Sequence, residues 1–224
     1  MNIFLDIETI PQQSESETKA EIASTIKHPV QMKKPETISA WHNGEGSYAG
    51  VKEALIDDTY RKTSFDGAKG QICSIAYAFE DNDPIAWAQE EGVDEETLLL
   101  EFSDQLRADL TGRPPFFVGH YISGFDLAFL WKRCVINRVI PGFKIPHIGR
   151  HDKDYFDTMI AWAGYKDRIS QDALCQALGI EGKPDGIDGS KVWDFFKEGR
   201  IEEIKAYNID DVLKVRKIYN RIAS

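Results

Sequence analysis

Apolar and polar positions are arranged along the chain in patterns that predict both strands and helices. Short apolar segments bounded by turn residues or by proline favour β-strands. The polar turn at residues 81–84 separates two such segments and predicts a hairpin. The predicted strands cover residues 2–8, 71–80, 85–89 and 114–118.

Helical spacing dominates the later part of the chain. Asp94 precedes a run with apolar residues at helical spacing up to residue 110, and Ser170 caps a short helix that Gly179 ends. Residues 154–164 are apolar and fit a strand or a helix equally. Further helices are predicted over residues 125–137, 190–198 and 201–222.

Residues 12–70 lack this regularity, apart from a helical pattern over residues 49–62. We therefore interpret about residues 11–70 as an elaboration on a single domain that spans residues 1–224. Because strands come first and helices follow, the expected fold class is α/β, with a mixed β-sheet flanked by helices.

Composition supports a globular chain and excludes several classes. Hydrophobic residues make up 42% of the 224 residues, which is enough for a sizeable core. No apolar run approaches the roughly 20 residues of a membrane helix, and residues 1–10 lack the basic start of a signal peptide. Cys73, Cys134 and Cys175 are widely spaced among apolar neighbours, which predicts buried reduced thiols and a cytoplasmic location.

The formal net charge of −10 argues against a broad surface for duplex nucleic acid, because neutralising phosphates requires Lys and Arg. It does not exclude a nuclease. A cluster of acids becomes electropositive once it has bound divalent cations.

Asp6 and Glu8 form the first candidate for chemistry. Side chains in a strand alternate between faces, so these two carboxylates lie on one face while Leu5 and Ile7 point into a core. Neighbouring carboxylates on an apolar strand repel each other, and a divalent cation relieves that repulsion. A chance pair on an edge strand is the alternative interpretation.

The last predicted helix supplies a third carboxylate. Tyr207 and Asp211 lie four residues apart and flank the apolar side of this helix, whereas Asp210 falls on the outside. Asp211 is either a ligand or an acceptor for a buried neighbour. The stripe they flank comprises Ile204, Asn208, Val215, Tyr219 and Ile222.

Asp126 follows an apolar strand and a turn over residues 119–124, and it falls in the first turn of a predicted helix. An acid is stabilised there by the helix dipole, so a purely structural role is the alternative. Together, Asp6, Glu8, Asp126 and Asp211 offer four oxygen ligands that suit Mg²⁺ or Mn²⁺. Two such ions about 4 Å apart can clamp both oxygens of a phosphodiester under attack.

These motifs resemble those of a known family. The order D-x-E at Asp6 and Glu8, F-D at Asp126, and Y-x-x-x-D at Tyr207 and Asp211 is similar to that of the DEDDy 3′–5′ exonucleases. The chain most resembles a stand-alone relative of the proofreading exonuclease of family B DNA polymerases, which has a ribonuclease H-like fold. The resemblance covers residues 3–9, 119–130, 156–162 and 174–212.

The resemblance implies a role for each of these residues. Asp6 is expected to bridge two metal ions, with Glu8 and Asp211 on the ion that activates water and Asp126 on the other. Tyr207 is expected to orient the attacking water, because a phenol with a pKa near 10 is a poor base at neutral pH. The histidine subclass carries His five residues before the last Asp, where this chain has Ala206.

Other residues are weaker candidates. Relatives often carry Asn in the turn before F-D, where this chain has Tyr121 or Ser123, so the pattern of substrate contacts differs here. A set of possible nucleic-acid contacts comprises Thr9, Tyr121, Ser123, Phe125 and Lys183. Core packing is the alternative role of Phe125. A plain turn residue is the alternative for Thr9, and a solvated loop is the alternative for Lys183.

Some further residues are assigned supporting or structural roles. Asp157 is expected to support the site without being a ligand. His147 and His151 lie in a predicted loop, which argues against a zinc site. Lys33, Lys34, Arg61 and Lys62 form either a substrate-guiding edge or a scattered surface.

The sequence therefore predicts a two-metal 3′–5′ exonuclease acting on single-stranded nucleic acid with a free 3′ end. DNA is the favoured substrate and RNA the other possibility, with a polymerase or repair protein as a separate partner. One alternative is a catalytically inactive ribonuclease H-like module that binds nucleic acid or protein. Another is a nucleotide phosphatase, which the lack of suitably spaced His ligands disfavours.

Overall fold

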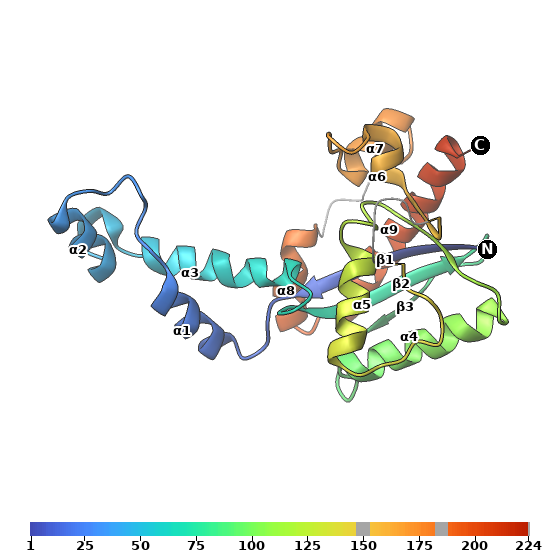
Figure 1. The fold of residues 1–224 in the computed structure, drawn as a ribbon, viewed down its shortest axis with the longest axis horizontal. Coiled ribbons are helices and arrows are strands. Elements are labelled where there is room, and N and C mark those ends of the chain that lie inside the picture. Colours follow the sequence, from blue (N-terminus) through green and yellow to red (C-terminus); the bar gives the residue numbers. More distant parts are fainter. Residues whose placement is uncertain (147–152, 182–187, 224) are drawn as a thin grey trace. The chain divides into compact units, whose positions relative to one another are not determined.

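The computed structural model describes residues 1–146, 153–181 and 188–223. The chain forms two compact units, of which the first comprises Met1–Thr9 with Ile72–Ser224 and the second comprises Ile10–Gln71. The second unit contains the predicted elaboration over residues 11–70. Figure 1 shows the elements of both units.

The first unit is built on a mixed five-stranded sheet with the order β3-β2-β1-β4-β5. β1 is parallel to β4, and β4 is parallel to β5, whereas β2 and β3 form the predicted antiparallel hairpin. β2 runs antiparallel to β1. The Glu80 N–H donates to the Asn2 carbonyl oxygen at one end, and the Cys73 thiol donates to the Glu8 carbonyl oxygen at the other. The strands are β1 (Asn2–Ile10), β2 (Gln71–Phe79), β3 (Ile85–Ala88), β4 (Phe116–Gly119) and β5 (Tyr155–Asp157).

Helices cover both faces of this sheet (Figure 1). On one face, α4 and α5 pack against Ile3, Leu5 and Ile7 of β1. On the other, α9 packs Val212 and Val215 against Phe4. The predicted mixed sheet with flanking helices is confirmed. The helices of this unit are α4 (Glu95–Leu110), α5 (Asp126–Ile136), α6 (Thr158–Ala163), α7 (Gln171–Leu178), α8 (Val192–Lys197) and α9 (Ile201–Ile222).

The helix starts have identifiable caps. The Asp94 carboxylate accepts a hydrogen bond from the Thr97 N–H, and the Ser170 hydroxyl accepts one from the Ala173 N–H, as predicted. The ambiguous segment over residues 154–164 contains both a strand and a helix, β5 and α6. The change occurs at Asp157, because its side chain caps the first N–H groups of α6.

A buried ion pair joins the two helices on the α4 face. Glu95 and Arg133 are almost fully buried and form two hydrogen bonds, at 2.9 and 2.6 Å. Glu95 also accepts from the Ile72 N–H and from the Asn137 side chain. Each charge is thereby paired and hydrogen-bonded, as a buried ion pair requires.

The second unit is helical. Its helices are α1 (Glu15–Thr25), α2 (Pro35–Asn43) and α3 (Val51–Arg61), with 3₁₀ turns η1 (Gly46–Tyr48) and η2 (Lys62–Phe65). α3 matches the predicted helix, but the expectation of no other regular structure here is wrong. α1 has no apolar stripe, since Thr18 is its one buried residue. Instead, Lys19 lies 2.6 Å from both Glu15 and Asp57 and over the Tyr60 ring, and these contacts hold α1 against α3.

The three cysteines are buried free thiols, as predicted. Burial raises the pKa of the Cys73 and Cys134 thiols, so they stay protonated. Among the described residues, no helix has the length and apolar character needed to cross a membrane.

Candidate active site

Asp6 and Glu8 lie on the face of β1 that is opposite to Leu5 and Ile7, as strand alternation predicts. Both acids are therefore on the side covered by α9. Glu8 is only 9% exposed and Asp6 is half-buried. The two carboxylates thus share a poorly solvated surface at which like charges repel.

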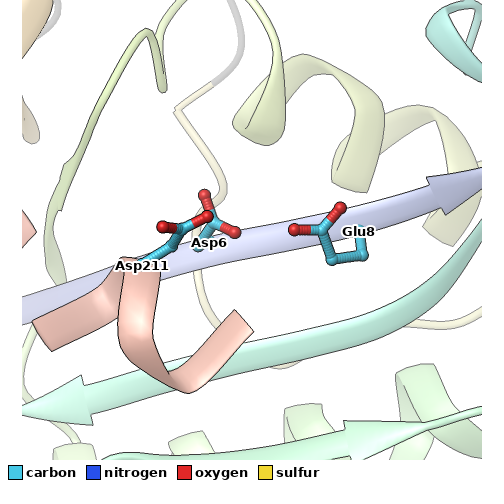
Figure 2. Close-up of side chains that lie close together, drawn as sticks. All are labelled: Asp6, Glu8 and Asp211. Atoms are coloured by element: carbon cyan, nitrogen blue, oxygen red, sulfur yellow. The ribbon is translucent and has the colours of Figure 1, made fainter. Parts of the chain in front are cut away.

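Asp211 of α9 completes a group of three carboxylates. One oxygen from each of Asp6, Glu8 and Asp211 lies within 4.8 Å of the others. Figure 2 shows the group, with Asp211 reaching from the helix toward the two acids on the strand. An oxygen-only donor set with this charge suits a hard divalent cation such as Mg²⁺ or Mn²⁺. The residues present therefore fit a metal site.

Asp126 lies outside this group of three but is tied to the same strand. β4 pairs with β1 only as far as Phe4, so the later N–H groups on that side of β1 need other acceptors. The Ile7 N–H donates to Asp126 Oδ1 at 3.2 Å. Asp126 is therefore anchored to β1 between Asp6 and Glu8. Burial raises the pKa of Asp126 to about 7.

Tyr207 lies one turn before Asp211 on α9 and forms a side-chain hydrogen bond with it. Burial raises the pKa of this phenol above its usual value, and the charges of Glu8, Asp211 and Asp6 raise it further. Tyr207 therefore keeps its proton and acts as a donor at neutral pH.

Asn208 also belongs to the site, although the sequence pattern places it only in the apolar stripe of the last helix. It is completely buried. Its amide nitrogen lies 3.2 Å from both Asp6 Oδ2 and the Asp6 carbonyl oxygen, and its amide oxygen accepts from Ser74 Oγ at 3.1 Å. The opposite amide orientation would set its oxygen against the oxygens of Asp6. The sequence feature that could have revealed Asn208 is its polar amide side chain among the apolar, buried positions of α9.

Asp157 organises the turn that leads to Asp126. Its two carboxylate oxygens accept from the N–H groups of Tyr121 and Ser123 at 3.1 Å, and from Ser123 Oγ at 2.6 Å. They also accept from the N–H groups of Met159 and Ile160 in α6. Asp157 is thus surrounded by donors, which supports its predicted role as a supporting residue.

In this turn, the Tyr121 ring lies close to the backbone of Gly124. Tyr121 has a positive φ of 60°, which is unusual for a residue with a bulky side chain. A Cβ atom at Gly124 would lie 2.3 Å from the Tyr121 ring. Glycine at this position therefore leaves room for the Tyr121 ring beside the turn.

The N-terminus of α7 supports α9 behind Asp211. The Gln171 side chain donates to the Asp211 carbonyl oxygen at 2.8 Å. Lys214 is buried and lies 2.5 Å from Asp210 and 4.0 Å from Asp172. These contacts fix the part of α9 that carries Tyr207 and Asp211.

The weaker candidates fall in different places. Tyr121 and Ser123 line a cavity beside the turn. Thr9 lies inside β1 and is half-buried, next to Glu8. The Phe125 ring packs against the core and lies 5.4 Å from that of Phe129. Outside the described residues lie Lys183, His147 and His151.

The proposed basic edge divides in two. Arg61 pairs with Asp57 at 3.0 Å and Lys62 with Asp58 at 2.6 Å, so their charges are locally balanced. Lys33 and Lys34 are exposed. A guiding role for these lysines stays a prediction.

Comparison with solved structures shows the same fold in a polymerase. The chain is similar to a family B DNA polymerase from the hyperthermophilic archaeon Pyrobaculum calidifontis, with a TM-score of 0.54 and 17% sequence identity. The similarity covers 70% of this chain and 22% of the polymerase chain, so this chain corresponds to a small part of that protein. The predicted ribonuclease H-like fold is confirmed. No curated protein matches the chain.

A family model described as a predicted 3′–5′ exonuclease related to the exonuclease domain of PolB matches residues 69–224. The match includes Asp126, Tyr207 and Asp211, whereas Asp6 and Glu8 precede it and are brought to Asp211 by the fold. Since the match covers well over half of the chain, this chain belongs to the family of predicted 3′–5′ exonucleases related to the exonuclease domain of PolB.

Proposed function

We propose that the chain is a metal-dependent 3′–5′ exonuclease that hydrolyses single-stranded nucleic acid. The observation that supports this activity best is the group formed by Asp6, Glu8 and Asp211, with ligand oxygens within 4.8 Å of one another. Three acids this close on a half-buried surface are unfavourable without a cation.

The residues would divide the chemistry among them. Asp6, Glu8 and Asp211, together with Asp126, would hold two divalent cations. When bound, such ions neutralise the negative charge of the phosphodiester and lower the pKa of water. Tyr207 stays protonated and donates a hydrogen bond, which suits it to orient water rather than to remove its proton.

The reaction is a hydrolysis. A water oxygen forms a bond to phosphorus while the bond from phosphorus to the leaving 3′ oxygen breaks. The leaving oxygen takes up a proton, so the products are a nucleoside 5′-monophosphate and a strand shortened by one nucleotide with a free 3′ hydroxyl.

The expected substrate is a single strand, with DNA favoured and RNA the other possibility. The net charge of −10 disfavours extensive contact with duplex phosphates. Because the similar solved structure is a DNA polymerase, a separate polymerase or repair protein is the expected partner. The buried thiols suit a reducing compartment such as the cytoplasm.

The deciding experiment is digestion of 5′-labelled single-stranded DNA and RNA with Mg²⁺, Mn²⁺ or EDTA. The test variants are Asp6→Ala and Asp211→Asn. Asp104→Asn, which removes an exposed acid on α4, is the matched control. We expect a ladder shortening from the 3′ end with metal, kept by the control and lost in the test variants.

Two results would contradict the proposal. One is an intact substrate with every metal, and the other is equal digestion by wild type and both test variants. In either case, a ribonuclease H-like module without catalytic activity becomes the better interpretation. Measurable binding of the labelled strand without cleavage would then support that module.

A further inference from the structure

A cavity of about 340 Å³ lies beside the turn that carries Asp126. Tyr121, Ser123 and Gly124 of the turn form one part of its wall, and Asp126 follows Gly124 by two residues. Other parts come from Tyr155, Met159, Tyr165 and Arg168. The cavity is thus connected by a short, well-anchored segment of backbone to one of the proposed metal ligands.

The wall formed by the turn is fixed before any ligand binds. Asp157 holds the N–H groups of Tyr121 and Ser123 and the Ser123 hydroxyl. The absence of a side chain at Gly124 lets the Tyr121 ring lie against the turn. A preformed wall lowers the entropy cost of binding.

Arg168, another part of the wall, is anchored to the same turn. The Arg168 guanidinium lies 4.7 Å from the centre of the Tyr121 ring and donates to the Tyr121 hydroxyl at 3.1 Å. The next residue, Ile169, contributes its carbonyl oxygen to His120 Nε2 at 2.9 Å. These contacts keep a cation at the exposed edge of an aromatic cavity.

Aromatic side chains and one exposed guanidinium are the chemistry that recognises a nucleotide. Tyrosine rings stack on a base of any sequence, and Arg binds phosphate through several donors. One acid, Asp167, also lines this cavity beside Arg168. A larger cavity of about 590 Å³ beside β3 and α4 is lined by three acids, Glu90, Glu91 and Asp94, whose charges repel phosphate, and its described lining includes neither Lys nor Arg. The observations therefore favour the Tyr121–Arg168 cavity as the nucleotide site.

We propose that this cavity binds the nucleotide next to the one being removed, with its base against the exposed Tyr165 ring and its phosphate on Arg168. The proposal rests on the proposed exonuclease function, because it places this nucleotide upstream of the bond cleaved at the carboxylates. Arg168 would be a binding residue that contacts the substrate phosphate.

The test compares substrates that do and do not reach the cavity. One is a single-stranded DNA oligonucleotide, and the other is the p-nitrophenyl ester of thymidine 5′-monophosphate, which has no second nucleotide. For Arg168→Ala, we expect KM for the oligonucleotide to rise about tenfold or more. The kcat/KM for the ester should fall by a much smaller factor than the kcat/KM for the oligonucleotide. Lys166→Ala removes an exposed cation from the same loop, outside the cavity wall, and should leave both substrates unaffected.

Two kinetic results would overturn the proposal. Equal losses on both substrates would mean that Arg168 supports the fold or the chemical step. An unchanged KM for the oligonucleotide would mean that the cavity binds no nucleotide.

A binding measurement separates this proposal from the proposed function. Fluorescence anisotropy of the labelled oligonucleotide in EDTA requires no catalysis. Arg168→Ala should weaken binding about tenfold and reduce the slope of log affinity against log salt by about 0.7. If the wild type cleaves nothing, the exonuclease proposal fails while this measurement still decides on the cavity. Equal binding by wild type and Arg168→Ala would refute the cavity proposal, whether or not the enzyme cleaves.

Discussion

Asp126 Oδ1 accepts a hydrogen bond from the backbone N–H of Ile7, and this 3.2 Å contact ties the start of α5 to β1 between Asp6 and Glu8. The contact exists because β4 ends before this point, which leaves the Ile7 N–H in need of an acceptor. A carboxylate bound in this way is buried as well as close to other acids. Its protonation therefore affects folding.

Replacing Asp126 with Asn should make the metal-free protein more stable at alkaline pH. The pKa of Asp126 is raised from 3.8 to about 7, so the folded state binds its proton more tightly than the unfolded state does. The free energy of unfolding therefore falls as pH rises from about 4 to about 7. The Asn oxygen still accepts from the Ile7 N–H but carries no charge.

Urea denaturation in EDTA tests this prediction. Asp126→Asn should be roughly 2–4 kcal/mol more stable than wild type near pH 8, with no such increase in stability near pH 4. A gain independent of pH would contradict this account.

Asn208→Ala should weaken metal binding by about 10–100-fold, because the Asn208 amide holds the Asp6 carboxylate in place. The variant also leaves Ser74 without that acceptor, at a cost of about 1–3 kcal/mol in stability. Mn²⁺ affinity measured by titration calorimetry tests the first effect, and chemical denaturation tests the second. Asn220→Ala, an exposed site on the same helix, is the matched control. Unchanged Mn²⁺ affinity in Asn208→Ala would show that Asp6 needs no such support.

The buried pair of Glu95 and Arg133 predicts a strong non-additive effect on stability. Glu95→Gln leaves an uncompensated buried guanidinium and should cost about 3–5 kcal/mol. Arg133→Met should cost a similar amount, while the double variant should lose much less than the sum of the two. A double-mutant cycle of urea unfolding measures this coupling. In the control cycle, the exposed pair Asp104 and Arg107 should couple by less than about 1 kcal/mol. Additive effects at Glu95 and Arg133 would refute the predicted coupling.

Asp157→Asn should loosen the turn before Asp126 without unfolding the protein. The variant keeps one oxygen but replaces the other with an NH₂ group, which cannot accept from the Ser123 N–H and hydroxyl. We expect a loss of about 1–3 kcal/mol. Native-state hydrogen exchange should show faster exchange at the Tyr121 and Ser123 amides, while the amides of α4 change no more than global stability requires. Unaltered exchange at the turn would mean that Asp157 does not hold it.

Much of the first unit was predictable because its segments carry a clear periodicity. The bounds of α9 agree with the prediction, since a long apolar stripe and the preceding Gly199 define it. Strand alternation was enough to place Asp6 and Glu8 on one face of β1. In such segments, local pattern and tertiary packing favour the same structure.

The missed features depend on partners far away in the sequence. α1 is held by Lys19 and Asp57 rather than by an apolar stripe, so hydrophobic periodicity cannot reveal it. The role of Asn208 requires knowing that Asp6 and Ser74 lie opposite it. The position of Arg168 over Tyr121 likewise depends on how α6 and α7 are connected around the turn. No local pattern encodes these contacts.

The group of three carboxylates has a consequence for synthesis of the protein. Two of its members lie in the first strand and the third lies in the last helix, so the ribosome makes Asp211 long after Asp6 and Glu8. Contacts between residues so far apart in sequence form late in folding. A nascent chain whose last helix has not yet emerged therefore carries an incomplete set of the proposed ligands. Under the proposed function, such a chain would not cleave nucleic acid, including the messenger RNA from which it is being translated.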